Sequence, residues 1–380
     1  MISPTVSFGD LTRATSNTII SKFTLILSWI NGAYFFGYQE KLLMDRRRFT
    51  KLSGLTLASM AAAPLIGKLG DLESVAAAAT ATSSIALGAY IANAPGDPTQ
   101  LDAFSSTVGV TPSIVMWYQD WAHSTGFDTT GMNAVSARGA MPMITWEPFD
   151  YSMGVAQPNY SLAKIAGGAH DAYITQWAQG AKAYGKPFYL RFAHEMNGNW
   201  YPWGNGVNGN TTAQYISAWQ HVRAIFTQVG VTNARWIWSP NVAGKGNRGG
   251  TASGAFSSFY PGDAYVDWIG MDGYNWGTSQ SWSSWQTLAT IYGSTYGTLS
   301  KMSTKPMMVA EMSSAEVGGS KSGWITTGLS STILSSYPRI KAVVWFNENK
   351  ETDWRVNSSA SALSAYQQVA KSAPYQGKLT

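Results

Sequence analysis

Eight short runs of β-branched and aromatic residues alternate with helix-like segments from residue 85 onwards, and this alternation constrains the fold more than any other feature. The runs cover residues 85–91, 113–118, 141–146, 188–194, 235–239, 266–271, 307–311 and 342–346. Amphipathic stretches lie between them, for example at 172–183, 213–228 and 323–335. Eight strands separated by helices in about 300 residues is the pattern of a (β/α)8 barrel. A doubly wound sheet would also alternate, but no G-x-G-x-x-G motif follows an early strand. We therefore expect one (β/α)8 domain over residues 81–380.

Polar and aromatic residues follow nearly every expected strand. The segments are Gln119-Asp120-Trp121, Trp146-Glu147-Pro148, His194-Glu195-Met196-Asn197, Ser239-Pro240-Asn241, Asp272-Gly273-Tyr274, Glu311-Met312-Ser313 and Phe346-Asn347-Glu348. The opposite strand ends carry plain turns such as Gly185-Lys186-Pro187. Functional residues of these barrels gather at the carboxyl ends of the strands. The sequence therefore predicts a polar site on one rim of the barrel.

Six of these rim residues are carboxylates. They are Asp120, Glu147, Glu195, Asp272, Glu311 and Glu348. Hydrolysis of a glycosidic bond needs one carboxyl group to protonate the leaving oxygen and a second to attack or to activate water. A carboxylate that binds a hydroxyl group or braces a loop would occupy the same positions. Spacing alone does not choose among the six.

Composition narrows the classes of function. The chain has no cysteine and only four histidines, without an H-x-x-x-H pair, so we expect neither a metal nor a cofactor. The formal charge of +5 belongs mainly to residues 1–80, and no basic run follows them, so nucleic acid is not an expected partner. The 17 Trp and 19 Tyr fit either a large aromatic core or a carbohydrate cleft, since pyranose faces stack on aromatic rings.

The segment Asp45-Arg46-Arg47-Arg48-Phe49-Thr50-Lys51 resembles a twin-arginine export signal. A mildly apolar stretch follows at 52–66, and the small residues at 75–79 offer a cleavage site. We assign residues 44–80 to this signal and expect an exported protein, periplasmic or extracellular. A basic surface loop beside a buried helix is the alternative interpretation.

Residues 1–43 precede this signal, although arginine pairs of this kind normally lie close to the true N-terminus. Met44 stands two residues before Arg46, which favours an upstream extension that arises from a mis-assigned start codon. The apolar stretch at 23–38 is shorter than the roughly 20 residues that span a bilayer. A membrane anchor there is the less favoured alternative, and we expect no stable membrane partner after signal removal.

Fourteen consecutive residues in the fourth expected strand and its loop carry a specific resemblance. The run Leu190-Arg191-Phe192-Ala193-His194-Glu195-Met196-Asn197-Gly198-Asn199-Trp200-Tyr201-Pro202-Trp203 resembles the acid/base segment of glycoside hydrolase family 26. The run Met308-Val309-Ala310-Glu311-Met312-Ser313-Ser314 is similar to its nucleophile segment, and Trp268-Ile269-Gly270-Met271-Asp272-Gly273-Tyr274 to the strand between. The similarity extends over residues 85–350.

This resemblance implies a retaining mechanism, with the acid/base after strand 4 and the nucleophile after strand 7. By it, Glu195 is the acid/base and Glu311 is the nucleophile. Tyr274 matches a tyrosine that hydrogen-bonds the nucleophile, His194 a substrate contact at the scissile bond, and Trp200 an aromatic platform. Further candidate binding residues are Arg191, Asn197, Trp146, Glu147, Asp120, Trp276 and Trp345. Arg191 lies on the same strand face as Glu195, two pleats before it, and is a candidate brace for a carboxylate.

The expected function is endo-acting hydrolysis of β-1,4 bonds in mannan or in mixed-linkage β-1,3-1,4-glucan. Mannan is the commoner substrate in the resembled family, whereas Pro202 after Trp200-Tyr201 looks more like the glucan-cleaving branch. The alternatives are a non-catalytic polysaccharide-binding barrel and a transglycosylase that remodels cell-wall polysaccharide or exopolysaccharide. A β-linked polysaccharide is the expected partner, and we expect a monomer.

Overall fold

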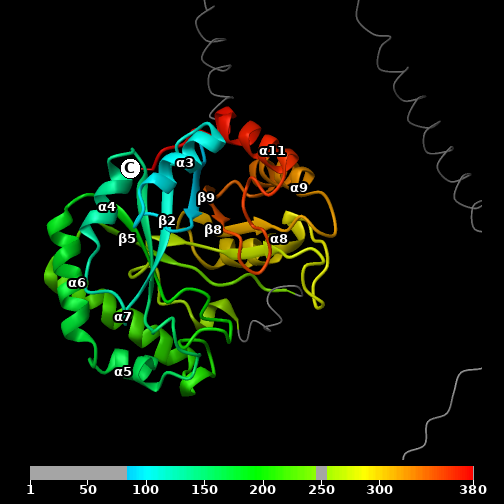
Figure 1. The fold of residues 1–380 in the computed structure, drawn as a ribbon. Coiled ribbons are helices and arrows are strands. Elements are labelled where there is room, and N and C mark those ends of the chain that lie inside the picture. The colour runs from blue at the N-terminus through cyan, green and yellow to red at the C-terminus, as the bar shows by residue number, and fades with distance from the viewer. Residues whose placement is uncertain (1–83, 245–254, 380) are drawn as a thin grey trace, which may run out of the picture. The chain divides into compact units, whose positions relative to one another are not determined.

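Nine parallel strands form a closed barrel in the computed structural model, which describes residues 84–244 and 255–379. The strands are β1 (Ala86–Ile91), β2 (Ile114–Asp120), β3 (Met141–Glu147), β4 (Phe188–Phe192), β5 (Ala234–Trp238), β6 (Trp268–Ile269), β7 (Asp272–Asn275), β8 (Met307–Ser314) and β9 (Ile340–Asn347). Their order is β6-β5-β4-β3-β2-β1-β9-β8-β7, and β6 also pairs with β8, which closes the ring. Because β6 and β7 are two halves of one position, the barrel has eight strand positions, and the predicted (β/α)8 fold is confirmed (Figure 1).

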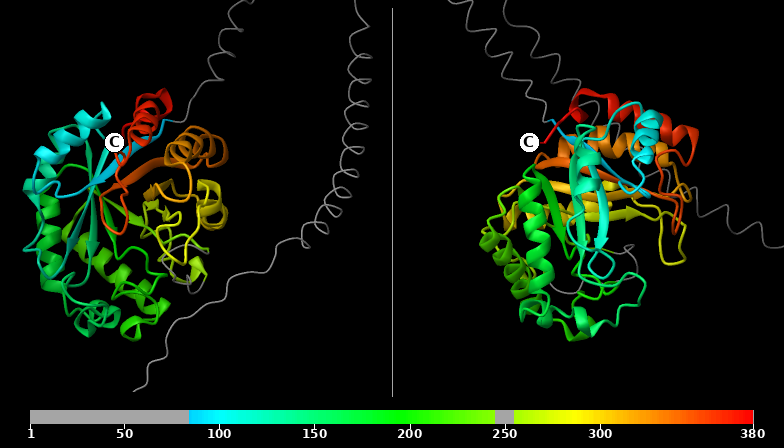
Figure 2. Two further views of the ribbon diagram at one scale, coloured as in Figure 1. Left: turned by 45° about the vertical axis from the view of Figure 1, so that its right-hand side comes forward. Right: turned by 60° about the vertical axis from the view of Figure 1, so that its left-hand side comes forward.

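Helices cover the outside of this barrel, as the turned views in Figure 2 show. They are α3 (Thr99–Val108), α4 (Thr129–Ser136), α5 (Leu162–Ala166), α6 (Asp171–Tyr184), α7 (Thr212–Val229), α8 (Leu288–Met302), α9 (Lys321–Thr327), α10 (Leu334–Ser336) and α11 (Ala360–Lys371). A π-helix, η5 (Gly328–Ile333), joins α9 to α10, so the expected helix at 323–335 is one irregular helical segment. Short 3-10 turns lie at Pro158–Tyr160, Val207–Gly209, Phe256–Ser258 and Ala373–Tyr375.

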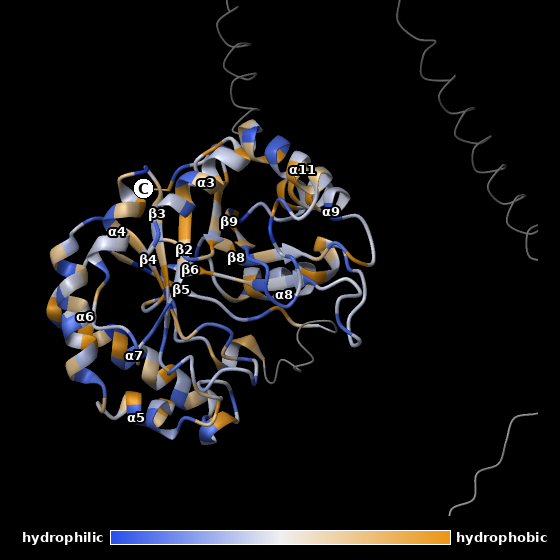
Figure 3. Ribbon diagram, viewed as in Figure 1, coloured by the Kyte–Doolittle hydropathy of each residue, from blue (hydrophilic) through white to orange (hydrophobic). Residues whose placement is uncertain are grey.

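Local sequence signals explain where the long helices begin and end. Thr211 caps α7 through a reciprocal capping box with Gln214, and Gly230 ends it in the left-handed conformation. Gly185 ends α6 in the same way. The helices bury one face against the strands, with Trp177 of α6 and Trp219 of α7 fully buried. Figure 3 shows the resulting mixture of polar and apolar residues around each helix.

Two apolar layers result from the alternation of side chains along each strand. Residues such as Ile114, Met143 and Val344 fill the barrel interior, and their neighbours in sequence point outward to the helices. The interior is so full that a Cβ at Gly88 would lie 2.7 Å from the Ile114 Cβ. A glycine at position 88 of β1 is therefore required by the close packing of side chains inside the barrel.

The expected strands differ from the observed ones mainly at their carboxyl ends. β4 ends at Phe192 and not at 194, whereas β8 continues to Ser314, three residues beyond Glu311. The predicted segments 1–43 and 44–80 lie outside the described residues. Among the residues that the structure does describe, no helix has both the length and the apolar character needed to span a membrane.

Candidate active site

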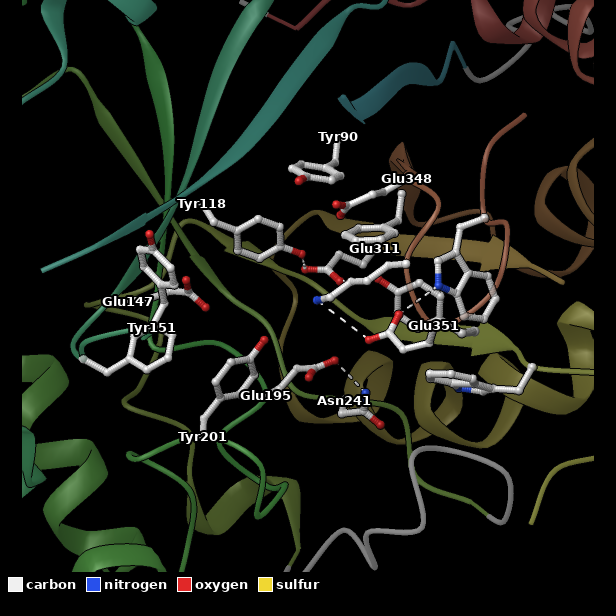
Figure 4. A pocket seen from close by; sticks show the side chains of 16 residues that line it. Tyr90, Tyr118, Glu147, Tyr151, Glu195, Tyr201, Asn241, Glu311, Glu348 and Glu351 are labelled. Atoms are coloured by element: carbon white, nitrogen blue, oxygen red, sulfur yellow. Dashed lines mark hydrogen bonds and ion pairs between the residues drawn. The ribbon is translucent and has the colours of Figure 1, made fainter. Parts of the chain in front are cut away.

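A cavity opens at the carboxyl ends of the strands, where the polar rim was expected. It is lined by 16 residues, which come from strand ends and from the loops that follow them. Glu195 and Glu311 both line it, and Figure 4 shows their carboxyl groups directed into the same space. Glu147, Tyr274 and Trp276 line it as well. The fold therefore brings together five residues that the sequence predicted for the site.

Glu311 lies within β8 and is held from two sides by phenol groups. The Tyr118 hydroxyl group donates a hydrogen bond to Oε1 over 2.6 Å, and the Tyr274 hydroxyl group donates to Oε2. Arg191 donates to Oε1 from Nη2. Burial by itself would raise the pKa of Glu311, but the charge of Arg191 and these hydrogen bonds outweigh it and lower the pKa. Glu311 is therefore held as a carboxylate.

Arg191 is a fully buried cation that connects two strands to the site. Its Nη1 lies 2.9 Å from Oδ2 of Asp272, and its Nη2 pairs with Glu311, which is directly opposite Asp272 in the β7–β8 register. Nε and Nη2 also donate to the Thr145 hydroxyl group at 2.9 and 2.7 Å. Burial opposes the charge of Arg191, but the two carboxylates raise its pKa well above the usual value. The fork geometry of the guanidinium group lets one residue orient both acids.

Glu195 sits where the chain leaves β4. Ala193 and Glu195 have φ angles of 44° and 51°, a left-handed conformation that non-glycine residues rarely adopt. Asn241 Nδ2 donates to Oε1 of Glu195, and Trp200 Nε1 donates to Oε2, each over 2.6 Å. The Glu195 amide donates to the Ser239 carbonyl at 2.8 Å. Backbone strain of this kind concentrates at functional sites, where surrounding contacts maintain it.

His194 precedes Glu195 in the chain, and its ring lies near the carboxylate of Glu311. Its side chain is fully buried, and Nε2 is 3.9 Å from Oε1 of Glu311. Its ring packs 4.7 Å from the ring of Tyr201, which lines the cavity. The structure thus places His194 behind the cavity wall, next to the nucleophile candidate.

Three further predicted residues do not line the cavity but form hydrogen bonds with residues near it. Trp200 is half-buried and donates to Glu195. Asn197 is buried and exchanges hydrogen bonds of 2.8 and 2.9 Å with the backbone of Asn241, so it positions that amide. The carboxylate of Asp120 is bonded to His123 Nδ1 at 2.7 Å.

The structure contradicts two predicted sugar contacts, Trp146 and Trp345. Both side chains are fully buried. Trp146 packs against Trp177 of α6, and Trp345 packs against Tyr366 of α11. The reason is strand parity, because Glu147 and Phe346 line the cavity and the residue before each of them must point to the opposite face.

Several residues of the site were not singled out from the sequence. Tyr118, Asn241 and Tyr201 contact the catalytic candidates or their neighbours, and Tyr90, Trp354 and Glu351 line the cavity beyond them. Glu348, one of the six rim carboxylates named from the sequence, lines the cavity as well. Tyr118 and Asn241 lie at the carboxyl ends of β2 and β5, which was the signal that located the other rim residues. In the described part of the chain, no group of three or more His, Cys, Asp or Glu residues has an arrangement that fits a metal ion.

Comparison with known proteins agrees with this geometry. The model of glycosyl hydrolase family 26 matches residues 114–314, which is just over half of the chain. The chain is 41% identical over 290 residues to "Endoglucanase H" of Acetivibrio thermocellus, covering 76% of this chain and 30% of the relative. It is 28% identical over 211 residues to "Mannan endo-1,4-beta-mannosidase" of Bacillus subtilis, covering 54% and 48%.

A solved structure also shares the fold. It is the catalytic domain of a GH26 endo-β-1,4-mannanase from Bacillus sp. JAMB-750, with a TM-score of 0.59 and 19% identity, covering 77% of this chain and 88% of that one. The chain spans between about a third and a half of the two curated relatives named above. The matched segment contains the ends of β2 to β8 and thus both catalytic candidates. The chain belongs to glycosyl hydrolase family 26.

Proposed function

We propose that this protein is a retaining, endo-acting glycoside hydrolase that cleaves β-1,4 bonds in mixed-linkage β-1,3-1,4-glucan. Glu311 is the nucleophile and Glu195 is the acid/base. The observation that carries the proposal is that Glu311 and Glu195 face one cavity and have different hydrogen-bond donors around them. Glu311 is held ionised by Arg191 and two phenols, and Glu195 faces the same space with two neutral donors around it.

The reaction has two balanced steps. The Glu311 carboxylate attacks the anomeric carbon while Glu195 gives its proton to the departing glycosidic oxygen, which yields a glycosyl-enzyme ester and a shortened chain. Glu195 then takes a proton from water, the resulting hydroxide equivalent attacks the same carbon, and Glu311 leaves as a carboxylate. Two inversions give net retention. The proposal requires a carboxyl separation of about 5–5.5 Å, the spacing of retaining pairs.

The choice of substrate rests on sequence identity to known proteins and on the loop after β4, where Pro202 follows Trp200-Tyr201. The chain is more similar to "Endoglucanase H" than to "Mannan endo-1,4-beta-mannosidase", 41% against 28% identity, and over a longer stretch. Glucose and mannose differ in the orientation of the C2 hydroxyl group. A buried partner left without its hydrogen bond rejects the wrong epimer strongly. Mannan is the alternative substrate.

Glu147 is our candidate for binding that hydroxyl group, because His194, the other residue considered, lies behind the cavity wall. The Glu147 side chain is only about 5% exposed, yet it lines the cavity at the end of β3 (Figure 4). Burial, with the nearby charges of Glu311 and Asp120, raises its pKa well above the ordinary value, although Arg191 opposes this. A neutral carboxyl group can donate a hydrogen bond to a sugar oxygen and accept another from a hydroxyl group.

Two experiments test this function. Proton NMR of the first product formed should show the β-anomer, and initial α-product would refute retention. Reducing-sugar assays on mixed-linkage glucan, mannan, cellulose and xylan should show at least about a tenfold preference for the glucan, which corresponds to about 1.4 kcal/mol. Preference for mannan would select the alternative substrate, and activity on xylan only would refute both.

We also propose export through the arginine pair at 46–47, followed by action as a monomer. The supporting features are the Arg46-Arg47-Arg48-Phe49-Thr50-Lys51 motif and the absence of cysteine, which suits a pathway that carries folded proteins. Replacing Arg46 and Arg47 by Lys should retain folded protein inside the cell, and translation from Met44 should export normally. Unchanged secretion of the double variant would overturn this proposal.

A further inference from the structure

Trp282 presents a large apolar ring to solvent next to the cavity. In the described part of the chain, Trp282 is one of the few large hydrophobic residues that stay exposed and the only tryptophan among them, with 42% of its surface accessible. Val317, which is 47% exposed, belongs to the loop that contacts the Trp282 loop, through a 3.1 Å bond from the Thr278 amide to the Val317 carbonyl. Two loops joined by this bond thus each present an exposed apolar residue, and we call Trp282 and Val317 the patch.

This patch is continuous with the wall of the cavity. The ring centroid of Trp282 lies 5.2 Å from that of Trp276, which lines the cavity and is only 6% exposed. Trp276 in turn packs 6.1 Å from Tyr274, whose hydroxyl group holds Glu311. Aromatic rings thus form an unbroken series from the nucleophile candidate to the solvent.

The loop that carries Trp282 is fixed in place. The Ser283 hydroxyl group donates to the Gly277 carbonyl at 2.8 Å, and that of Ser279 donates to the Trp276 carbonyl at 2.7 Å. The Asn275 side chain accepts from the amides of Gly277 and Gln286, which closes both ends of the loop. Gly277 has a φ of 53°, which a side chain would strain. A loop held this way loses little backbone freedom when the indole that it carries binds a ligand.

Another loop at the cavity carries a second exposed ring. Tyr151, in the loop after β3, lines the cavity and is 65% exposed. β3 and β7 occupy separate parts of the barrel, because the positions of β4 and β5 lie between them on one side and those of β2, β1, β9 and β8 on the other. Exposed aromatic rings thus stand at two separate places near the cavity, in the loops after β3 and after β7.

We propose that the indole of Trp282 is a platform for a sugar unit of the polysaccharide outside the cleavage pocket, and that it extends the chain length that the protein recognises. The inference rests on the proposed glycosidase function. The apolar face of a pyranose gains contact with the ring and its hydroxyl groups stay hydrated, which suits a half-exposed indole. The occupant is a β-linked glucan chain that extends out of the cavity.

The test compares Trp282→Ala with Trp282→Phe, which keeps a ring, and with Val155→Ala, an exposed apolar residue on another loop (40% accessible). With mixed-linkage glucan as substrate, Trp282→Ala should lose about five- to tenfold in kcat/KM, mainly through KM, and Trp282→Phe should recover most of it. Calorimetric titration of Glu311→Gln with gluco-oligosaccharides of increasing length should show a gain in affinity at the longest oligomers. That gain should vanish in Glu311→Gln/Trp282→Ala.

The outcomes separate this inference from the function beneath it. If wild type cleaves the glucan and Trp282→Ala stays within about twofold of it at every chain length, the platform is overturned and the function stands. If wild type cleaves none of the polysaccharides tested, the function itself fails. A changed oligomeric state of Trp282→Ala in size-exclusion chromatography, without a change in affinity for oligosaccharides, would identify the patch as a contact between copies and overturn the proposal.

Discussion

The ends of β4 and β8 present the two catalytic candidates in different ways. Glu311 lies inside an eight-residue strand that is buried throughout and paired on both sides. Glu195 lies three residues beyond the end of β4, in a segment with two left-handed residues. One carboxyl group is thus part of the rigid sheet, whereas the other is carried on a tight, irregular turn above it.

The hydrogen-bond donors around the carboxyl groups of Glu311 and Glu195 also differ, in their charge. Glu311 receives a cationic donor and two phenols, and the charge of Arg191 is shared with Asp272. The hydrogen bonds to Glu195 from Asn241 and Trp200 come from neutral groups. A nucleophile must stay ionised, whereas an acid/base must exchange a proton in each step. The comparison teaches that the carboxyl group at β8 is held in the sheet beside a cation, whereas the one after β4 is held on an irregular turn by the neutral donors Asn241 and Trp200.

Removal of either carboxyl group gives the largest expected effects. Glu311→Ala should lose at least about 10⁴-fold in kcat on polysaccharide, because no group replaces the covalent step. Azide should restore turnover on aryl glycosides with activated leaving groups. Glu195→Ala should lose about 10²–10⁴-fold on polysaccharide but far less on activated aryl glycosides, which need no proton. Near-wild-type rates on polysaccharide for either variant would break the assignment.

Arg191→Met tests whether the cation of Arg191 stabilises the ionised carboxyl group of Glu311. It leaves Glu311 and Asp272 buried together without their cation, so unfolding stability should fall by about 3–5 kcal/mol. It should also raise the pKa of Glu311, because the main interaction that lowers this pKa is lost. Chemical denaturation and pH–rate profiles measure the two effects. Arg191→Lys keeps the charge but not the fork, and should recover part of the stability only. An Arg191→Met protein with unchanged stability and pH profile would contradict the role given to this pair.

The sequence predicted the fold and the polar rim for physical reasons that apply locally, whereas the choice of Glu195 and Glu311 among the six rim carboxylates came from the family resemblance. Runs of β-branched and aromatic residues and the turn residues between them are visible in a short window, and the residues at their carboxyl ends share one rim in a parallel barrel. Arg191 was predicted as a brace by the same reasoning, and the structure pairs it with acids from β7 and β8.

The features that could not be predicted from the sequence depend on which face of a strand a residue occupies and on contacts across the barrel. Trp146 and Trp345 were one residue out of phase with the cavity, and a strand end does not reveal which of two neighbours points inward. Tyr118 contacts Glu311 from 193 residues away, so no local pattern relates them. Trp282 lies in a loop, where periodicity gives no information about exposure.

Tyr118→Phe tests the neutral part of the environment of Glu311. Activity is lost as pH falls through the pKa of Glu311, and this pKa is lowered from 4.5 in the wild-type protein. Loss of the Tyr118 hydrogen bond destabilises the ionised form, so the acid limb of kcat/KM should move upward by about one pH unit, or about 1.4 kcal/mol. Trp200→Phe, which changes a donor to Glu195, should leave this acid limb in place. An acid limb that moved in Trp200→Phe but not in Tyr118→Phe would reverse the comparison.

A pair of alanine-to-glycine changes isolates the backbone strain after β4 and gives the smallest expected effect. In Ala193→Gly, relief of the left-handed conformation contributes about 1 kcal/mol. The lost methyl burial, about 0.8 kcal/mol, and the added freedom of the unfolded chain, about 0.4–1 kcal/mol, work against it. Ala310→Gly in β8 loses an equally buried methyl from extended strand and gains no such relief. Thermal and urea unfolding should therefore show Ala193→Gly close to wild type and Ala310→Gly less stable by about a further 1 kcal/mol. Equal destabilisation of the two variants would mean that the turn carrying Glu195 stores no strain, and the contrast between the two strand ends would then rest on their charges alone.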